Sequence, residues 1–348
     1  MENRFLSLTV APDGSIVSLT DRENGLPLLS EGQRMNDWRL YANVQAVYDA
    51  WEMDRDWESR RVPEAFETEV TLVSSGGAAA ECRVLRRFSQ SRAVQTIRLT
   101  ASSRRVDFET ELDWHERRRM LKAHFESNIL ADDAIHEMQF GHVLRPCHRS
   151  HAFAADRYEV PQHRFSALAE ENRGFALLND GIYALSTDRG ELALTLCRAP
   201  LVPDDKNNLG KHVFTYSLYP FATSFAQSGV VREGYALNRP LVPFGGRIER
   251  FKGPFVGPGP VILETVKPAL DGDGIILRLY QSLRETREGT VTLPWDCDFY
   301  ASDMAEETGR GDLLGSGRSL TVVLSPFEVR TVRAVKRGVR SSPALRQS

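Results

Sequence analysis

The stretch Val106-Asp107-Phe108-Glu109-Thr110-Glu111-Leu112 alternates apolar or β-branched residues with acidic ones over the length of one strand. A period of two places alternate side chains on opposite faces, which predicts a half-buried antiparallel strand. Many strands without intervening helices favour stacked antiparallel sheets, because parallel strands need a crossover of about a dozen residues. We therefore predict an all-β chain. Similar runs occur at residues 66–72, 82–88, 94–99, 121–125, 192–196 and 213–218.

Two turn motifs lie between such runs. Pro12-Asp13-Gly14 separates residues 5–10 from residues 16–19, and Asn179-Asp180-Gly181 separates residues 175–178 from residues 182–185. Gly and Asp or Asn in this arrangement are typical of tight turns, so each motif predicts a β-hairpin. One short helix of one or two turns is expected at residues 166–172.

The chain divides at a region rich in proline and glycine, residues 240–260, where regular strand pairing is interrupted. A length of 348 residues allows about two domains. We predict a large antiparallel β-supersandwich at residues 1–242, a linker at 243–260, a smaller β-sandwich at 261–336 and a flexible tail at 337–348. Residues 306–318 of the smaller sandwich are expected to form a Gly-rich loop.

The composition excludes several classes of partner. The formal net charge is -3, with 44 basic and 47 acidic residues, so no broad positive field attracts nucleic acid. The N-terminus lacks the apolar run of about 7–15 residues of a signal peptide, and no segment reaches the ~20 apolar residues that span a bilayer. We therefore expect no membrane partner and a cytoplasmic location. The four cysteines have no CxxC spacing and are expected to be reduced and buried.

Two histidine motifs begin like the zinc-binding sequence HExxH. They are His115-Glu116 and His136-Glu137, but Arg119 and Phe140 occupy the positions of the second histidine. The nucleophile motif GxSxG and the Walker phosphate-binding motif are also absent from the sequence. We therefore predict no catalytic residue and no metal ligand in this chain.

Two segments have a composition that suits ligand binding. Tyr48-Asp49-Ala50-Trp51-Glu52 mixes aromatic rings with carboxylates, which can stack on a sugar and accept hydrogen bonds from its hydroxyl groups. The alternative is packing of these rings beneath a loop. In residues 158–165, Pro161 stiffens the backbone beside His163 and Arg164, which suits the presentation of a guanidinium to a ligand. The alternative there is a buried ion pair.

These segments occur in order with several further motifs, and together they resemble the C-terminal region of the α-mannosidases of glycoside hydrolase family 38. Tyr48 stands where many members have tryptophan. The resemblance extends from Glu2-Asn3 to about Val335. The motifs that carry it are Tyr48-Asp-Ala-Trp51-Glu, Phe140-Gly-His-Val-Leu-Arg145-Pro146, Glu159-Val-Pro-Gln-His163-Arg164-Phe165, Gly174-Phe-Ala-Leu-Leu-Asn179-Asp180-Gly-Ile-Tyr183, Leu196-Cys-Arg198-Ala-Pro200 and Gly210-Lys-His212-Val-Phe214-Thr-Tyr216-Ser-Leu-Tyr219-Pro220.

The resemblance implies a fold and a function. Family members are retaining α-mannosidases with a zinc-binding catalytic domain, a helical bundle and β domains that include a supersandwich of the galactose mutarotase type. This chain matches the β region, and the family's His-x-Asp zinc motif is absent from it. The resemblance therefore implies that zinc and the catalytic aspartates belong to an upstream domain, that this chain holds no cofactor, and that the chain alone does not hydrolyse mannosides.

By the same analogy, Arg164 lies near the bound sugar, and His163, Tyr48, Asp49 and Trp51 are further candidate substrate-binding residues. The expected partners are a mannose-containing oligosaccharide or glycoside and the upstream catalytic domain. Two other functions stay open: a stand-alone carbohydrate-binding module, with the aromatic segment as its platform, and a mutarotase-like sugar epimerase, which would use a histidine and a carboxylate as acid and base.

Overall fold

The computed structural model describes residues 1–44, 48–63, 66–242, 245 and 253–338. Two compact units are distinguished by their contacts. Unit 1 comprises Met1–Met138 and Val143–Pro240, and unit 2 comprises Gln139–His142 and Leu241–Ser348. Half of the predicted linker (243–244 and 246–252) and most of the predicted tail (339–348) lie outside the described residues.

Unit 1 contains an eight-stranded sheet in which the described strands pair antiparallel. Its strands follow the order β1-β2-β3-β9-β16-β15-β12, and β4 also pairs with β3. Their bounds are β1 Leu6–Val10, β2 Ile16–Asp21, β3 Met35–Ala42, β4 Arg61–Val62, β9 Arg119–Glu126, β12 Val160–Pro161, β15 Ala184–Asp188 and β16 Glu191–Arg198.

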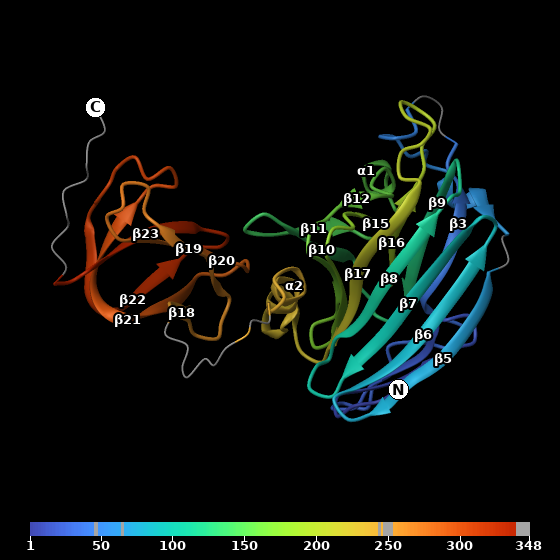
Figure 1. The fold of residues 1–348 in the computed structure, drawn as a ribbon, viewed down its shortest axis with the longest axis horizontal. Helices are drawn as coiled ribbons and strands as arrows, with labels where there is room; N and C mark the ends of the chain where they lie inside the picture. The colour runs from blue at the N-terminus through green and yellow to red at the C-terminus, as the bar shows by residue number, and fades with distance from the viewer. Residues whose placement is uncertain (45–47, 64–65, 243–244, 246–252, 339–348) are drawn as a thin grey trace. The chain divides into compact units, whose positions relative to one another are not determined.

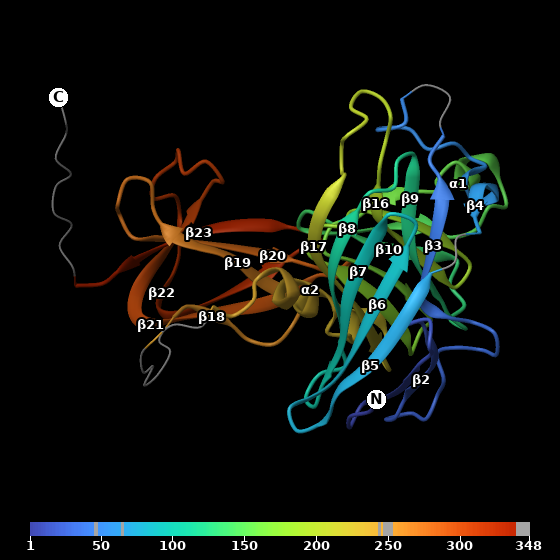
Figure 2. The ribbon, with the colours of Figure 1, turned by 45° about the vertical axis from the view of Figure 1, so that its right-hand side comes forward.

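A nine-stranded sheet forms the second layer of the fold (Figures 1 and 2). Its strands follow the order β11-β10-β13-β14-β17-β8-β7-β6-β5. In Figure 1 its long strands β5 to β8 run side by side, coloured blue to green. Their bounds are β5 Glu67–Gly76, β6 Ala79–Phe88, β7 Ser91–Thr100, β8 Val106–Trp114, β10 Asp133–Met138, β11 Gly141–Pro146, β13 Phe165–Ala169, β14 Gly174–Asn179 and β17 Gly210–Phe221.

The alternation in the sequence explains how the two layers pack. Along β7, the alternate residues Ala93, Gln95, Ile97 and Leu99 are buried, whereas the residues between them are only partly buried. Side chains from both sheets, among them Phe108 of β8 and Phe125 of β9, form one continuous apolar core, and these two rings meet edge to face. The predicted all-β supersandwich is thereby confirmed.

A polar network crosses this core. Tyr216 accepts a hydrogen bond from the indole of Trp38 at 3.0 Å and donates one to Asn36 at 2.6 Å. Gln95 lies between Tyr216 and Arg86, with hydrogen bonds of 2.7 Å and 3.1 Å. All five side chains are buried, so these bonds replace the water that the polar groups lose on folding.

One predicted hairpin is confirmed and the other is wrong. β1 and β2 pair across Pro12-Asp13-Gly14. β14 and β15 do not pair, because they belong to different sheets. The reason lies in the turn, where the Asn179 side chain accepts hydrogen bonds from the N–H groups of Gly181 and Ile182, and Asp180 accepts from Thr215 N. The turn therefore carries the chain from one layer to the other.

The helix predicted at residues 166–172 is also wrong, because residues 165–169 form β13. This strand is buried along most of its length, so it lacks the polar alternation that marks half-buried strands. Within the described ranges the helices are α1, Ala152–Ala155, and α2, Val230–Asn238, with single 3-10 turns at Trp57–Arg60 and Phe225–Gln227. α2 packs through Val230 against an apolar cluster of β13, β14 and β17.

Unit 2 contains a six-stranded sheet with the order β18-β21-β23-β20-β19, and β22 also pairs with β21. It encloses an apolar core that includes Leu277, Phe299 and Val332. The expected Gly-rich loop is shorter than predicted, because β22 already begins at Leu313. The bounds are β18 Phe255–Val256, β19 Val261–Pro268, β20 Ile275–Gln281, β21 Arg287–Ser302, β22 Leu313–Leu324 and β23 Val329–Lys336.

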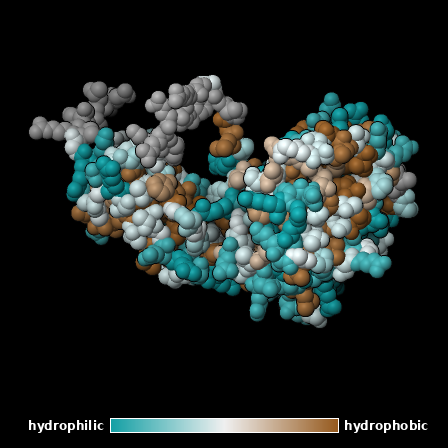
Figure 3. All heavy atoms as spheres, turned by 90° about the horizontal axis from the view of Figure 1, so that it is seen from below, coloured by the Kyte–Doolittle hydropathy of each residue, from teal (hydrophilic) through white to brown (hydrophobic). Residues whose placement is uncertain are grey.

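The four cysteines are free and buried, as the sequence predicts: Cys82, Cys147, Cys197 and Cys297. On the face shown in Figure 3, hydrophilic and hydrophobic residues are interspersed on each unit. Among the described residues, every helix is too short or too polar to cross a membrane.

Candidate functional site

The aromatic segment predicted from the sequence forms one wall of a pocket in unit 1. The pocket has a volume of about 700 Å³, within the ~300–1,000 Å³ typical of ligand pockets. Its lining combines two exposed tyrosine or tryptophan rings with carboxylates and arginines. The lining residues are 51–55, 156, 158–161, 183, 184 and 198.

Trp51 is the most exposed aromatic ring of this pocket. The residue is 69% exposed, which is unusual for tryptophan, and its ring meets that of Tyr48 edge to face at 5.5 Å. Tyr48 is itself 50% exposed. Neither ring is packed beneath the loop, so the indole face is available to an incoming ligand.

Several contacts hold the loop that carries Trp51. The buried carboxylate of Asp49 accepts hydrogen bonds from the backbone N–H groups of Leu201 and Val202, at 2.6 Å and 2.8 Å. The Tyr158 hydroxyl donates to the backbone oxygen of Met53, and Arg198 donates to that of Glu52. Asp49 therefore positions the loop and does not line the pocket.

Glu159 presents a carboxylate at the pocket. One of its oxygens, Oε2, pairs with the ammonium of Lys122 and accepts a hydrogen bond from the Thr195 hydroxyl at 2.8 Å. Lys122 is fully buried beneath it, over the ring of Trp57, and burial lowers the pKa of this lysine despite the opposing charge of Glu159. The second oxygen, Oε1, accepts no hydrogen bond from the described residues, so it can accept one from a ligand.

Arg164 follows β12 and is held by a buried carboxylate. Glu137 Oε1 accepts hydrogen bonds from Arg164 Nη2 and Nε at 2.6 Å and 3.1 Å, and Oε2 accepts one from the Arg164 backbone N–H at 2.9 Å. The guanidinium also lies 3.8 Å from the ring centre of Tyr235 in α2. Burial acts to lower the pKa of Arg164, but the hydrogen bonds and charge of Glu137 raise it above its ordinary value.

His163 lies between this ion pair and the pocket. Its Nδ1 is 3.8 Å from Glu137 Oε2, and its ring meets the ring of Tyr183 at 5.4 Å. Tyr183 lines the pocket. The structure thus places Trp51 in the pocket wall, Tyr48 against Trp51, and His163 against a lining residue, whereas Arg164 is in contact with Glu137 and is not a lining residue.

Sequence reasoning did not single out Glu159, Tyr183 and Arg198 as site residues, although each occurs in a motif that carries the family resemblance. No local pattern distinguishes them from neighbouring polar residues. In the described ranges, no group of three or more His, Cys, Asp or Glu side chains is arranged to hold a metal ion.

Comparison with known proteins agrees with this fold. A profile described as "Glycosyl hydrolases family 38 C-terminal domain" matches residues 1–206, and one described as "Glycosyl hydrolases family 38 C-terminal beta sandwich domain" matches residues 260–332. The chain belongs to glycosyl hydrolase family 38. Both matches are to the C-terminal domains of that family.

The curated relatives are considerably longer than this chain. It is 31% identical to "Alpha-mannosidase 2C1" of Mus musculus, over 96% of this chain and 33% of the relative. It is 30% identical to "Alpha-mannosidase G" of Dictyostelium discoideum, over 96% of this chain and 32% of the relative. The chain therefore spans about a third of the length of these family 38 relatives.

Among solved structures, an alpha-mannosidase from Enterococcus faecalis V583 superposes with a TM-score of 0.77 at 14% identity, covering 96% of this chain and 41% of that chain. At this level of identity the likeness concerns the fold alone. It extends over nearly all of this family 38 chain.

Proposed function

We propose that this chain is the substrate-shaping C-terminal β region of a retaining α-mannosidase, and that the pocket beneath Trp51 receives part of a mannose-containing glycoside. The observation that carries the proposal is the exposed Trp51 indole beside a pocket that also contains Glu159 and Arg198. A sugar ring offers a C–H face for stacking and hydroxyl groups for hydrogen bonding, and this lining offers the complement of both.

Each residue has a distinct part in this proposal. Trp51 stacks on the sugar, with Tyr48 fixing the indole from the side. Glu159 Oε1 accepts a hydrogen bond from a hydroxyl group, while the buried Lys122 keeps Oε2 occupied and the carboxylate in place. Arg164, fixed by Glu137, orients the glycoside through His163 and Tyr183, whose rings are in contact. These residues bind and position, and no bond-breaking step is assigned to them.

Hydrolysis of terminal α-D-mannosyl residues is proposed to need zinc and catalytic aspartates supplied by an upstream catalytic domain, the expected partner of this chain. Two features support this division. The His-x-Asp motif is absent from the sequence, and the described residues contain no cluster suited to a metal. We expect the chain alone to release no chromophore from a chromogenic α-mannoside, with zinc or with a chelator.

The decisive test is the binding of methyl α-mannopyranoside to the chain, measured by calorimetry. We expect weak, saturable binding that Trp51→Ala abolishes, because its stacking surface is lost. Phe255→Ala, which removes a ring of similar exposure from unit 2, is the matched control and should leave binding unchanged. Equal binding by wild type and Trp51→Ala would refute the proposed site, and chelator-sensitive hydrolysis would refute the division of roles.

Two measurements separate the alternatives: the same calorimetric titration and an assay of anomer interconversion. A stand-alone carbohydrate-binding module predicts binding that is lost with Trp51→Ala but unaffected by Arg164→Ala. A mutarotase-like epimerase predicts interconversion of sugar anomers by the purified chain, lost on replacement of one histidine. A polarimetric assay with mannose measures this second activity directly.

A further inference from the structure

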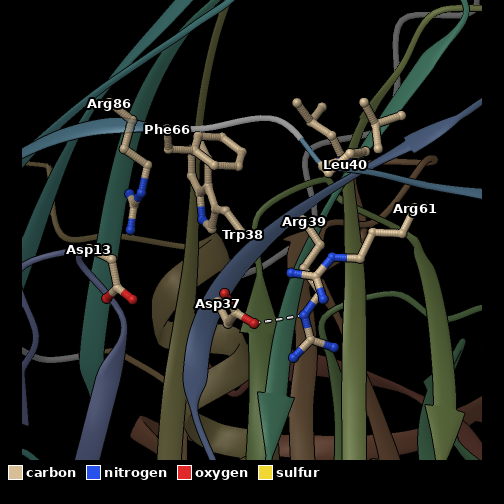
Figure 4. A pocket seen from close by; sticks show the side chains of 10 residues that line it. Asp13, Asp37, Trp38, Arg39, Leu40, Arg61, Phe66 and Arg86 are labelled. Atoms are coloured by element: carbon tan, nitrogen blue, oxygen red, sulfur yellow. Dashed lines mark hydrogen bonds and ion pairs between the residues drawn. The ribbon is translucent and has the colours of Figure 1, made fainter.

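A second cavity of unit 1 lies in a gap of the eight-stranded sheet, away from the pocket beneath Trp51. β2 pairs with β3 at Met35, and β4 pairs with it at Leu40 and Tyr41. Between these points, the described strands leave that edge of β3 without a partner. The cavity of about 590 Å³ occupies this gap and is shown in Figure 4.

Arg86 reaches this cavity from β6 and is almost fully buried, with 1% of its surface exposed. Its Nη1 donates to Gln95 Oε1 at 3.1 Å, and its guanidinium lies 4.4 Å from the ring centre of Trp38. Its Nη2 is buried and has no hydrogen-bond partner. A buried cationic group without a paired anion is costly, and Arg86 lines this cavity, so an anion held there would lie near its uncompensated charge.

The two carboxylates of the lining do not pair with Arg86. Asp13 accepts hydrogen bonds from Ser15 at 2.6 Å and from Arg34 at 2.6 Å, and Asp37 accepts one from Arg39 at 2.6 Å. Burial lowers the pKa of Arg86 to about 10, so its guanidinium is still charged at neutral pH. The charge is therefore present without a paired anion.

Arg61 supplies a second donor. In Figure 4 it extends into the cavity from the opposite side of β3, and among the described residues its exposed side chain forms no hydrogen bond or ion pair. The described lining residues include three arginines and two aspartates, a net formal charge of +1 for this set. Trp38 and Phe66 provide apolar wall. The unpaired groups of Arg61 and Arg86 are cationic hydrogen-bond donors, so a ligand that complements them must carry acceptor oxygens.

We infer that this cavity binds a small carboxylate-bearing ligand of the size of a sugar acid. Its carboxylate accepts from the exposed guanidinium of Arg61, the buried charge of Arg86 attracts it from the inner wall, and the remainder of the ligand lies against Phe66. Charge-assisted hydrogen bonds of this kind are about twice as strong as neutral ones, so the carboxylate and not the hydroxyl groups should determine affinity. The inference is independent of the mannoside site proposed above.

The test compares glucuronate with glucose, two probes that differ at one carbon, by calorimetric titration of the full chain at fixed ionic strength. We expect glucuronate to bind at least about tenfold more tightly than glucose, and Arg61→Ala to reduce glucuronate affinity by about tenfold. Arg87→Ala, which removes an exposed arginine from the same strand as Arg86, is the matched control and should have no effect.

Arg86→Met gives a second readout, with folding checked by circular dichroism. We expect this variant to fold and to lose glucuronate binding; if it does not fold, the result with Arg61→Ala decides. Equal affinities for glucose and glucuronate would overturn the inference in favour of a site for neutral sugars. Absence of saturable glucuronate binding, or binding unchanged by Arg61→Ala, would also overturn it and leave Arg86 a structural residue.

Discussion

The pair formed by Glu137 and Arg164 should show a large energetic coupling. The Glu137 side chain is 4% exposed and that of Arg164 is 23% exposed, so the pair is neither fully buried nor on the surface. Removing one partner of a fully buried pair costs about 3–5 kcal/mol. In Glu137→Gln the guanidinium can still reach water, so we expect a smaller loss of unfolding free energy, about 2–3 kcal/mol.

Arg164→Met should cost more, about 3–5 kcal/mol, because it leaves the less exposed charge of Glu137 without a partner. The double variant Glu137→Gln/Arg164→Met should then be more stable than the sum of the single effects predicts, by about 2 kcal/mol. Urea unfolding followed by tryptophan fluorescence measures these values. Four of the five tryptophans lie in unit 1, so this signal reports mainly on the unit that contains the pair.

The matched control is the more exposed pair of Arg98 and Glu81, with side chains 35% and 23% exposed. The same double-mutant cycle there should give a coupling below about 1 kcal/mol. Additive effects of Glu137→Gln and Arg164→Met, within about 0.5 kcal/mol, would refute the view that Glu137 fixes the arginine.

Three further predictions concern unit 1. Burial lowers the pKa of His136 to about 3, so between pH 6.5 and pH 3 this histidine is protonated in the unfolded chain but neutral in the folded one. The free energy of unfolding should therefore fall by about 2 kcal/mol from pH 7 to pH 5, and urea titrations of His136→Gln at the two pH values should lack this contribution. Gly14→Ala should lower the unfolding free energy by about 1–3 kcal/mol and the thermal midpoint by several degrees, because φ is +79° and the new Cβ would lie 2.4 Å from Arg86 Nη2. An unchanged midpoint would contradict this geometry. Asp49→Ala should accelerate tryptic cleavage within residues 48–57, since it removes two hydrogen bonds that hold this loop; wild-type cleavage rates would count against that role.

The strands of half-buried sheets could be predicted from the sequence because their exposed faces need polar residues. This holds for β7 and β8, where buried and partly buried positions alternate. It fails for β13, which is buried on both faces and looks like any short apolar run. α2 was missed for the opposite reason, because only Val230 and Gly234 of its nine residues are buried, which leaves almost no apolar stripe to detect.

The site was predictable only where its chemistry is local. Tyr48 and Trp51 attracted notice because rings and carboxylates lie together in the sequence, and the structure places Trp51 in a pocket wall. The pairing of Lys122 with Glu159 joins residues 37 positions apart, and depends on how β9, β16 and β15 align across one sheet. Nothing local to Lys122 indicates that it will be fully buried.

The strand order of the nine-stranded sheet has a consequence for the synthesis of this chain. β17, residues 210–221, lies between β14 and β8 and pairs with both. Until these residues leave the ribosome, β8 and β14 each present an unpaired edge, and the sheet is divided into two parts. Such edges favour association with other chains. A nascent chain that ends shortly before residue 210 should therefore aggregate, whereas one that extends beyond residue 240 can close the sheet in a single step.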